Sequence, residues 1–374
     1  MTARSEEVQI GISLSSLGYL LAGLGACVAI LARDLHEPTG RLALLSSAFA
    51  VGLVIVAAVG PRLLRSWSIG VVLRAGSVIC AAGAALLALA PLYAVVVVGG
   101  LCIGLGGALL VLLAPLMLHG PTAAARLSRV NAVASASGIL APLTIGLIDA
   151  LGITGRVAML IAVPPLLILA TVKGPDVVPP VLSEAPTGHA VGRTVALGWL
   201  RVVLAVGVEF CFVVWAVARL VDSGLTLAVA ALLGSSFPIG MAVGRAIGPV
   251  HWRSVSPVVI GGSLAIIGTL FVSLLNAPAL IALGLIIAGI GVAPLYPVTL
   301  AALVAMPGLS PTRLAALGAL ASGTAILITP AALAGLARLV DLRLAYLITI
   351  PLLLVLFALS RSVRPVVRSS AAVQ

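Results

Sequence analysis

The chain has 374 residues, of which 62% are hydrophobic and 8% are charged, and its mean hydropathy is +1.30. These values exclude a soluble globular domain and indicate a protein embedded in a lipid bilayer. The formal net charge of +11 comes from scattered arginines rather than from a basic stripe with interleaved aromatic residues, so nucleic acid is not an expected partner.

Apolar stretches follow one another from Ile10 to Arg361 and are separated by short polar joints. A membrane-spanning helix needs about 20 apolar residues, and an open strand cannot satisfy its backbone in lipid. The sequence therefore predicts an all-α membrane protein with twelve transmembrane helices, near residues 9–32, 41–61, 69–90, 93–118, 126–148, 155–172, 195–218, 224–247, 256–275, 278–304, 313–337 and 342–360. The first stretch is too long for the apolar region of a signal peptide and follows Glu6 and Glu7, so we expect it to remain in the mature protein.

The chain contains an internal repeat. Residues 44–72 recur as residues 232–260, at a constant offset of 188. The matched positions include Phe49 with Phe237, Gly52 with Gly240, Gly60-Pro61 with Gly248-Pro249, and Arg65-Ser66 with Arg253-Ser254. Each copy reads as an apolar helix, a Gly-Pro pair, a basic turn and the next apolar helix. A two-fold repeat of membrane helices is typical of transporters.

The arginines predict how the chain is oriented. With the N-terminus inside, fifteen Lys and Arg residues lie on or near the cytoplasmic side, Arg245 among them, and six lie outside. This bias predicts cytoplasmic termini. Both copies of the Gly-Pro turn then face the cytoplasm, so we expect two parallel halves of six helices each. The many arginines and the single lysine indicate a bacterial source, so the expected location is the plasma (inner) membrane of a bacterium.

The predicted domains follow from this symmetry. We expect an N-terminal six-helix bundle at residues 1–172, a proline-rich cytoplasmic linker at 173–193, and a C-terminal bundle with a basic tail at 194–374. The four cysteines and four histidines are scattered without metal-like spacing, so neither a metal nor another cofactor is expected. A monomer is the expected state.

Glu209 is the candidate for proton coupling. It lies near the middle of the seventh predicted span, where a charge costs about 2.5–3.5 kcal/mol on insertion scales. The repeat places Leu21 or Ala22 opposite it, so the acid does not belong to the repeated scaffold. Such an acid can take up and release a proton as water access changes sides. The alternative is a glutamate that stays protonated and fixes helix packing.

Asn131, Tyr296 and Trp215 are candidate cavity residues, because Asn131 and Tyr296 also differ from their counterparts in the other half. A ring packed against the Pro294 and Pro297 kink explains Tyr296 equally well, and an interfacial anchor is the favoured reading of Trp215. Polar and small residues that recur in both halves are instead expected to pack helices: Ser46, Ser47, Ser235, Ser236, Gly104, Gly106, Gly107, Gly289 and Gly291.

With twelve helices in two parallel halves and a Gly-x-x-x-x-Arg turn after the second and eighth spans, the chain resembles the major facilitator superfamily. In the family's loop motif Gly60 and Arg65 are retained in the first half, and Gly248 and Arg253 in the second, whereas Leu64 replaces the aspartate. Residues 206–209 and 291–297 are similar to the fucose-permease-like branch. A small-residue pattern from Ser137 to Gly146 is similar to exporters, so both directions of transport stay open.

The resemblance implies a secondary transporter that moves a small molecule by alternating access, with a proton as the expected coupling ion. The halves would rock about a cavity lined by helices 1, 4, 7 and 10. The sequence offers no arginine near mid-depth and few Asn, Gln, Asp or His residues, so we expect an amphipathic or hydrophobic substrate rather than a sugar. There are two alternatives: a transport-inactive sensor or scaffold of the same fold, and a membrane-embedded transferase. The transferase is disfavoured because the histidines lack acidic neighbours. An enzyme is therefore not expected.

Overall fold

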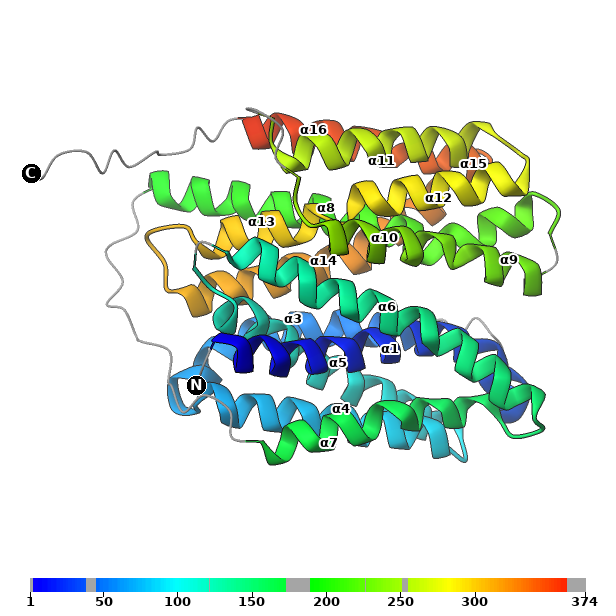
Figure 1. The fold of residues 1–374 in the computed structure, drawn as a ribbon, viewed down its shortest axis with the longest axis horizontal. Coiled ribbons are helices and arrows are strands. Elements are labelled where there is room, and N and C mark those ends of the chain that lie inside the picture. The colour runs from blue at the N-terminus through cyan, green and yellow to red at the C-terminus, as the bar shows by residue number, and fades with distance from the viewer. Residues whose placement is uncertain are drawn as a thin grey trace, which may run out of the picture.

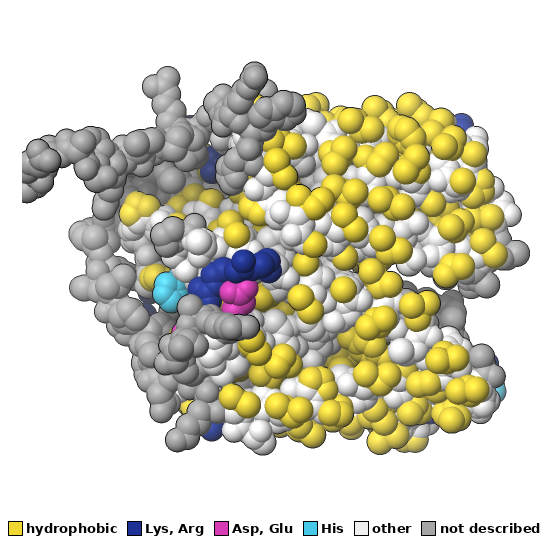
Figure 2. All heavy atoms as spheres, viewed as in Figure 1, with side chains coloured by type: hydrophobic (Ala, Val, Ile, Leu, Met, Phe, Trp, Pro, Cys, Tyr) yellow, Lys and Arg dark blue, Asp and Glu magenta, His cyan; other side chains and the backbone are white. Residues whose placement is uncertain are grey.

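The computed structural model describes residues 3–37, 45–120, 122–172, 189–225, 227–250 and 255–361. Its elements are helices, and they run nearly parallel to one long axis in two stacked bundles (Figure 1). α1 begins and α16 ends at the same end of the molecule (Figure 1). Apolar side chains cover most of the face seen in Figure 2, as expected for a surface that contacts lipid.

The first half of the chain forms one bundle. Its elements are α1 (Ala3–Leu35), α3 (Leu45–Ser66), α4 (Ile69–Leu89), α5 (Tyr93–Met117), α6 (Ala123–Ala150), the 3₁₀ helix η1 (Gly155–Ala162) and α7 (Val163–Thr171). η1 continues directly into α7, so the two together form one span of residues 155–171.

The second half forms the other bundle. Its elements are α8 (His189–Asp222), α9 (Leu227–Gly234), α10 (Ser236–Ile247), α11 (Pro257–Leu274), α12 (Pro278–Val292), α13 (Leu295–Val304), α14 (Pro311–Leu336), α15 (Leu342–Ala345), η2 (Tyr346–Ile348) and α16 (Thr349–Arg361). α8 begins at His189, within the segment expected to be a linker, whose residues 173–188 lie outside the described part of the chain.

The prediction of an all-α membrane protein with twelve spans is confirmed. In the described residues, nine helical segments are long and apolar enough to cross a membrane, and residues 155–171 and 232–247 form two shorter apolar ones. α3, of 22 residues, completes the twelve. Some spans are interrupted: α9 gives way to α10 at Ser235, and α12 to α13 at Ala293 and Pro294. Pro238 and Pro294 lack the N–H that would continue the helical ladder through these points.

The two Gly-Pro pairs differ in conformation, which corrects the expectation of two equivalent turns. Pro61 lies inside α3, which continues to Ser66. Gly248 instead ends α10 with φ of 80°. The next helices begin alike, because Ser68 accepts a hydrogen bond from Val71 N (3.4 Å) and Ser256 accepts one from Val258 N (3.3 Å), capping α4 and α11.

Repeated glycines allow repeated helices to approach closely, as predicted. A Cβ atom at Gly52 in α3 would fall closer than 3.0 Å to the backbone of Gly104 in α5, and one at Gly240 in α10 would do the same to Ile286 in α12. A Cβ at Gly106 would lie 2.6 Å from the Gly76 carbonyl oxygen, and its counterpart Gly291 meets Gly261 at 2.5 Å. The recurring glycines therefore serve helix packing.

The two bundles meet mainly where α3 packs on α14 and α6 packs on α10, with smaller contacts of α5 with α14 and of α13 with α5 and α6. At the first contact, a Cβ on Gly323 of α14 would lie 3.1 Å from the carbonyl oxygen of Ala50 in α3. At the second, the Ser128 hydroxyl of α6 donates to the backbone carbonyl of Arg245 in α10 (2.9 Å). The second contact includes Arg245, which also bonds to Glu209 and Ser135 in the interior.

Candidate functional site

A buried ion pair joins α8 to α10. Arg245 Nη2 donates to Glu209 Oε1 at 2.9 Å, and the two side chains are 8% and 14% exposed. Glu209 lies in the interior of the 34-residue α8, and Arg245 lies in the last turn of α10. The acid identified from the sequence therefore has a cationic partner that is close in space and 36 residues away along the chain.

This pair corrects the expectation that no arginine is available at depth. The positive-inside count places Arg245 on or near the cytoplasmic side, at the end of the predicted span 224–247. In the structure it is 7% exposed and turned inward. α10 ends at Ile247 and packs closely on α12, where a Cβ at Gly244 would lie 2.6 Å from the Ile290 carbonyl oxygen. The guanidinium reaches Glu209 of α8 and Ser135 of α6.

Arg245 also contacts the other half of the molecule. Its Nη1 donates to the hydroxyl of Ser135 in α6 at 2.5 Å, and its backbone carbonyl accepts from Ser128. Its Nε is buried and has no hydrogen-bond partner among the described residues. The arginine thus joins Glu209 to the contact between the bundles and keeps one donor unused.

Tyr296 belongs to the same group of residues. It is the second residue of α13, two positions after Pro294, and its hydroxyl lies close to Ser322 of α14. Glu209 and Arg245 are near enough to influence this hydroxyl electrostatically. The interruption at Pro294 therefore lies near the ion pair.

Sequence reasoning missed Ser135 and Ser322. The two serines occupy matched positions of the repeat, in Ala132-Val-Ala-Ser135 and Ala319-Leu-Ala-Ser322. Repetition indicates scaffold residues, yet Ser135 accepts a hydrogen bond from Arg245. Ser322 donates to the Gly318 carbonyl of its own helix (3.1 Å) and lies close to the Tyr296 hydroxyl. The signal that could have identified them is a hydroxyl at the same place in the two repeated helices, α6 and α14.

The structure places the other two cavity candidates beside this group, without hydrogen bonds to it. Asn131 lies one turn before Ser135 and donates from Nδ2 to the Leu127 carbonyl of its own helix (2.8 Å). Trp215 Nε1 donates to the carbonyl oxygen of Pro330 in α14 (3.1 Å), which fixes α8 to α14. In this conformation both side chains donate their hydrogen bonds to backbone carbonyls.

The loop-motif residues lie apart from the ion pair. A Cβ at Gly60 would lie 2.6 Å from Leu112 Cδ2, so this glycine allows α3 to approach α5. Arg65 is exposed in the last turn of α3, and Gly248 ends α10. Arg253 lies outside the described residues. No group of three or more His, Cys, Asp or Glu side chains suited to a metal ion occurs in the described part of the chain.

A second buried arginine, Arg219, has a structural role. It donates to the carbonyl oxygens of Val272 (3.0 Å) and Leu275 (2.7 Å) and to Asn276 Oδ1 (3.2 Å). It also lies 3.6 Å from Asp222. Its donors are directed to the end of α11, whereas those of Arg245 reach Glu209 of α8 and Ser135 of the other bundle. The two residues illustrate different uses of a buried guanidinium.

The buried pair balances its own charge. The carboxylate of Glu209 is the counterion of Arg245, and a buried guanidinium that loses its counterion is strongly destabilising.

Comparisons with known proteins agree on the fold. No protein-family model and no curated sequence matches the chain. Among solved structures, it is similar to the major facilitator superfamily transporter FucP in the outward conformation, with a TM-score of 0.71 and 19% identity over 95% of this chain and 99% of that one. FucP is the Escherichia coli fucose:proton symporter.

Two further structures extend the likeness. The human organic anion transporter MFSD10 matches with a TM-score of 0.67 and 19% identity, covering 96% of this chain and 99% of that one. A double-tryptophan variant of XylE matches with a TM-score of 0.74 and 15% identity, covering 96% and 95%. The chain therefore has the fold of the major facilitator superfamily transporters, and the predicted resemblance is confirmed at the level of fold. It is an integral membrane protein.

Proposed function

We propose that the protein is a secondary transporter that moves a small molecule by alternating access and couples this movement to protons through Glu209. The observation that carries the proposal is the buried Glu209–Arg245 pair, which also contacts Ser135 of the opposite half. Burying a charged pair at the junction of two bundles costs free energy, and acids inside membrane spans most often serve function. The fold supports the same conclusion, because a proton symporter shares it.

In the proposed cycle, the charge on Glu209 controls Arg245. The ionised carboxylate holds the guanidinium, which in turn holds Ser135, so the bundles stay in contact at this point. A proton on Glu209 removes the counterion and weakens this hold. An anionic group of the substrate can then pair with Arg245, using the free Nε donor. Proton and substrate thereby favour each other's binding, which is the requirement for coupling.

The surroundings of the pair favour an amphipathic substrate. Tyr296 packs in a cluster of apolar residues that includes Val206 and Phe210 of α8. One arginine beside an aromatic and aliphatic wall suits a molecule with a single anionic group and an apolar body. A sugar would require more hydrogen-bonding groups than this wall supplies. We place the protein in a bacterial plasma membrane with both termini in the cytoplasm, in accord with the arginine distribution.

Transport in liposomes tests the proposal. A thermal-shift screen of small amphipathic anions supplies the substrate, and purified protein is then assayed with an imposed pH gradient. We expect substrate-dependent proton movement in the wild type and its loss in Glu209→Gln. Asp341→Asn is the matched control, because Asp341 pairs with Arg343 at 3.6 Å on an exposed surface.

Each outcome decides between the alternatives. Wild-type coupling in Glu209→Gln would refute the role of this acid. A ligand that stabilises the protein yet crosses in no condition would instead favour the transport-inactive sensor or scaffold. Chemical conversion of the ligand would favour the membrane-embedded transferase.

A further inference from the structure

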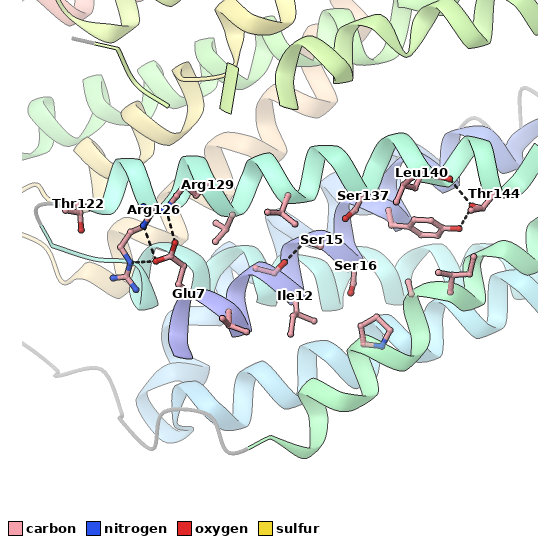
Figure 3. Close-up of a pocket in the computed structure, with 18 residues that line it drawn as sticks. Glu7, Ile12, Ser15, Ser16, Thr122, Arg126, Arg129, Ser137, Leu140 and Thr144 are labelled. Carbon is pink, nitrogen blue, oxygen red and sulfur yellow. Dashed lines mark hydrogen bonds and ion pairs between the residues drawn. The ribbon is translucent and has the colours of Figure 1, made fainter. Parts of the chain in front are cut away.

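A groove opens on the side of the N-terminal bundle, away from the Glu209–Arg245 pair. Figure 3 shows α6 along one edge, α7 along the other and α1 as the floor. The cavity has a volume of about 920 Å³, within the range of small-molecule sites. Its rims carry Val133 (54% exposed), Leu140 (55%) and Ile161 (50%), so the groove faces the surroundings of the bundle. In a membrane those surroundings are lipid.

One end of the groove is ionic. Glu7 of α1 accepts from Arg126 Nε (3.3 Å) and from Arg129 Nε (3.0 Å) and Nη2 (3.3 Å) of α6 (Figure 3). Glu6 lies 4.0 Å from Arg126. Two acids and two arginines therefore balance in charge. Figure 2 shows such a cluster of basic and acidic side chains on an otherwise largely apolar face.

The ionic cluster remains accessible. The side chain of Arg129 is 62% exposed, and that of Glu7 is 27% exposed. The Nη1 atom of Arg129 makes no hydrogen bond to any described residue. The cluster can therefore take an external phosphate on the arginine side and an external ammonium on the carboxylate side while keeping its own pairs.

The side chains that line the remainder of the groove are mostly apolar, although several hydroxyls lie among them. Ser15 donates to the Gly11 carbonyl (2.6 Å), and Thr144 is bonded to the Leu140 carbonyl (3.0 Å) and to Tyr19 (2.5 Å). These two hydroxyls are satisfied by neighbouring groups. Ser16 and Ser137 also line the groove, among side chains that are mostly apolar. From Glu7 to Tyr19 the floor runs twelve residues of helix, about 18 Å.

We propose that this groove binds one glycerophospholipid whose headgroup carries a phosphate and a primary amine, with an acyl chain lying along α1. Arg126 and Arg129 contact the phosphate, and Glu7 contacts the ammonium. A lipid with a net negative headgroup fits less well, because Glu6 and Glu7 already offset the arginines. The depth and the apolar lining suit an acyl chain and do not suit a soluble phosphate compound.

Lipid retention tests this proposal without reference to transport. The full-length protein is exchanged into an equimolar mixture of phosphatidylethanolamine, phosphatidylglycerol and phosphatidylcholine with identical acyl chains, and bound lipid is measured by native mass spectrometry. We expect phosphatidylethanolamine to be retained preferentially. Arg129→Gln and Glu7→Gln should each weaken its retention about tenfold, the scale of one charge-assisted hydrogen bond.

Two glycines provide a matched pair of variants for the acyl channel. A Cβ at Gly11 would meet only Val130 Cγ1 at 3.9 Å, so Gly11→Leu fills the groove without a backbone clash. A Cβ at Gly146 would meet nothing within 4 Å, and this residue lies outside the groove. Gly11→Leu should abolish retention, whereas Gly146→Leu and Arg62→Gln should leave it unchanged. Equal or better retention of phosphatidylglycerol, or lipid bound normally by Gly11→Leu, would overturn the assignment.

Discussion

At the scale of single residues, the structure adds most at Arg245. Glu209 could be identified from the sequence because an acid in an apolar run is conspicuous. Its partner could not, because the pairing of residues 36 apart depends on how α8 and α10 cross. The distribution of positive charges placed Arg245 near the cytoplasmic surface. Burial and direction are tertiary properties, and they decided the role of this residue.

The ion pair predicts an asymmetric mutational response. Arg245→Met removes the counterion of a buried carboxylate and should lower the free energy of unfolding by about 3–5 kcal/mol. The double variant Glu209→Gln/Arg245→Met should recover part of this loss, since no charge then remains uncompensated. Thermal unfolding in a mild detergent measures both.

Arg343→Met is the control for this cycle. Arg343 and Asp341 are 40% and 68% exposed, and such pairs contribute about 0–1 kcal/mol. If the double variant were less stable than Arg245→Met alone, the pair would not be the reason for the destabilisation.

At the scale of elements, the repeat predicted packing more reliably than conformation. The glycines that recur at an offset of 188, such as Gly52 and Gly240, both admit a neighbouring backbone. The Gly-Pro pairs recur equally well in sequence, yet one lies inside α3 and the other follows the end of α10. Close approach of two helices needs only the absence of a Cβ. Continuation of a helix past proline depends on the surrounding structure, and only α3 continues past its proline.

Gly240→Leu should disrupt the packing of α10 on α12. The new side chain would clash with backbone atoms of Ile286, and a backbone cannot relieve the clash by changing rotamer. We expect a loss of about 1–3 kcal/mol or failure to fold. Gly146→Leu has open space at the same substitution and should behave like wild type. The yield of monodisperse protein and its melting temperature measure the difference, and equal values for both variants would contradict the packing role.

A second element-scale prediction concerns the ends of α1 and α6 and the start of η1. Arg33 binds Asp149 (2.8 Å) and Asp34 (3.0 Å), and Asp34 accepts from Thr154 at 2.5 Å. Burial alone would raise the pKa of Asp34, but the hydrogen bonds from Thr154 and Arg33 outweigh it and lower the pKa. The stabilisation is therefore complete above the unfolded pKa of about 4 and is lost as the pH falls through the lowered value.

Thr154→Val should lower the melting temperature at pH 7 and make its fall below about pH 4 smaller, because the folded pKa of Asp34 then lies nearer the unfolded one, while Thr154→Ser should retain the wild-type profile. Melting temperatures between about pH 3 and pH 7 record the shift. Identical profiles for Thr154→Val and wild type would show that the hydroxyl does not set the pKa of Asp34.

At the scale of the whole molecule, sequence sufficed for the class of architecture. Periodic apolar runs, positive charges and the repeat predicted two six-helix halves, because these features are fixed by the bilayer and by duplication. Which helices meet between the halves was not predictable, since Ser128, Ser135 and Gly323 carry no signal of their partners. The site depends on that contact, and it was therefore predicted only in part.

Gly323→Leu should shift the balance between conformations. A side chain at this position would press on Ala50, Leu53 and Val54 of the other half, with contacts at 3.1 Å from the Cβ alone. We expect α3 and α14 to separate and transport to slow. Distances between spin labels on the two helices report the shift, and Gly335→Leu, a position on α14 with nothing within 4 Å, provides the control. Unchanged distances in Gly323→Leu would exclude this contact as a determinant of conformation.

The proline that follows Gly248 has a consequence for water. Pro249 has no N–H, so the carbonyl oxygen of Arg245 has no donor four residues along the chain. In this conformation the Ser128 hydroxyl of the other bundle supplies one at 2.9 Å. An unsatisfied carbonyl in hydrocarbon costs several kcal/mol. In the proposed cycle, separation of α6 from α10 would leave this oxygen without its donor, so we expect water to enter the Glu209–Arg245 site as the bundles part.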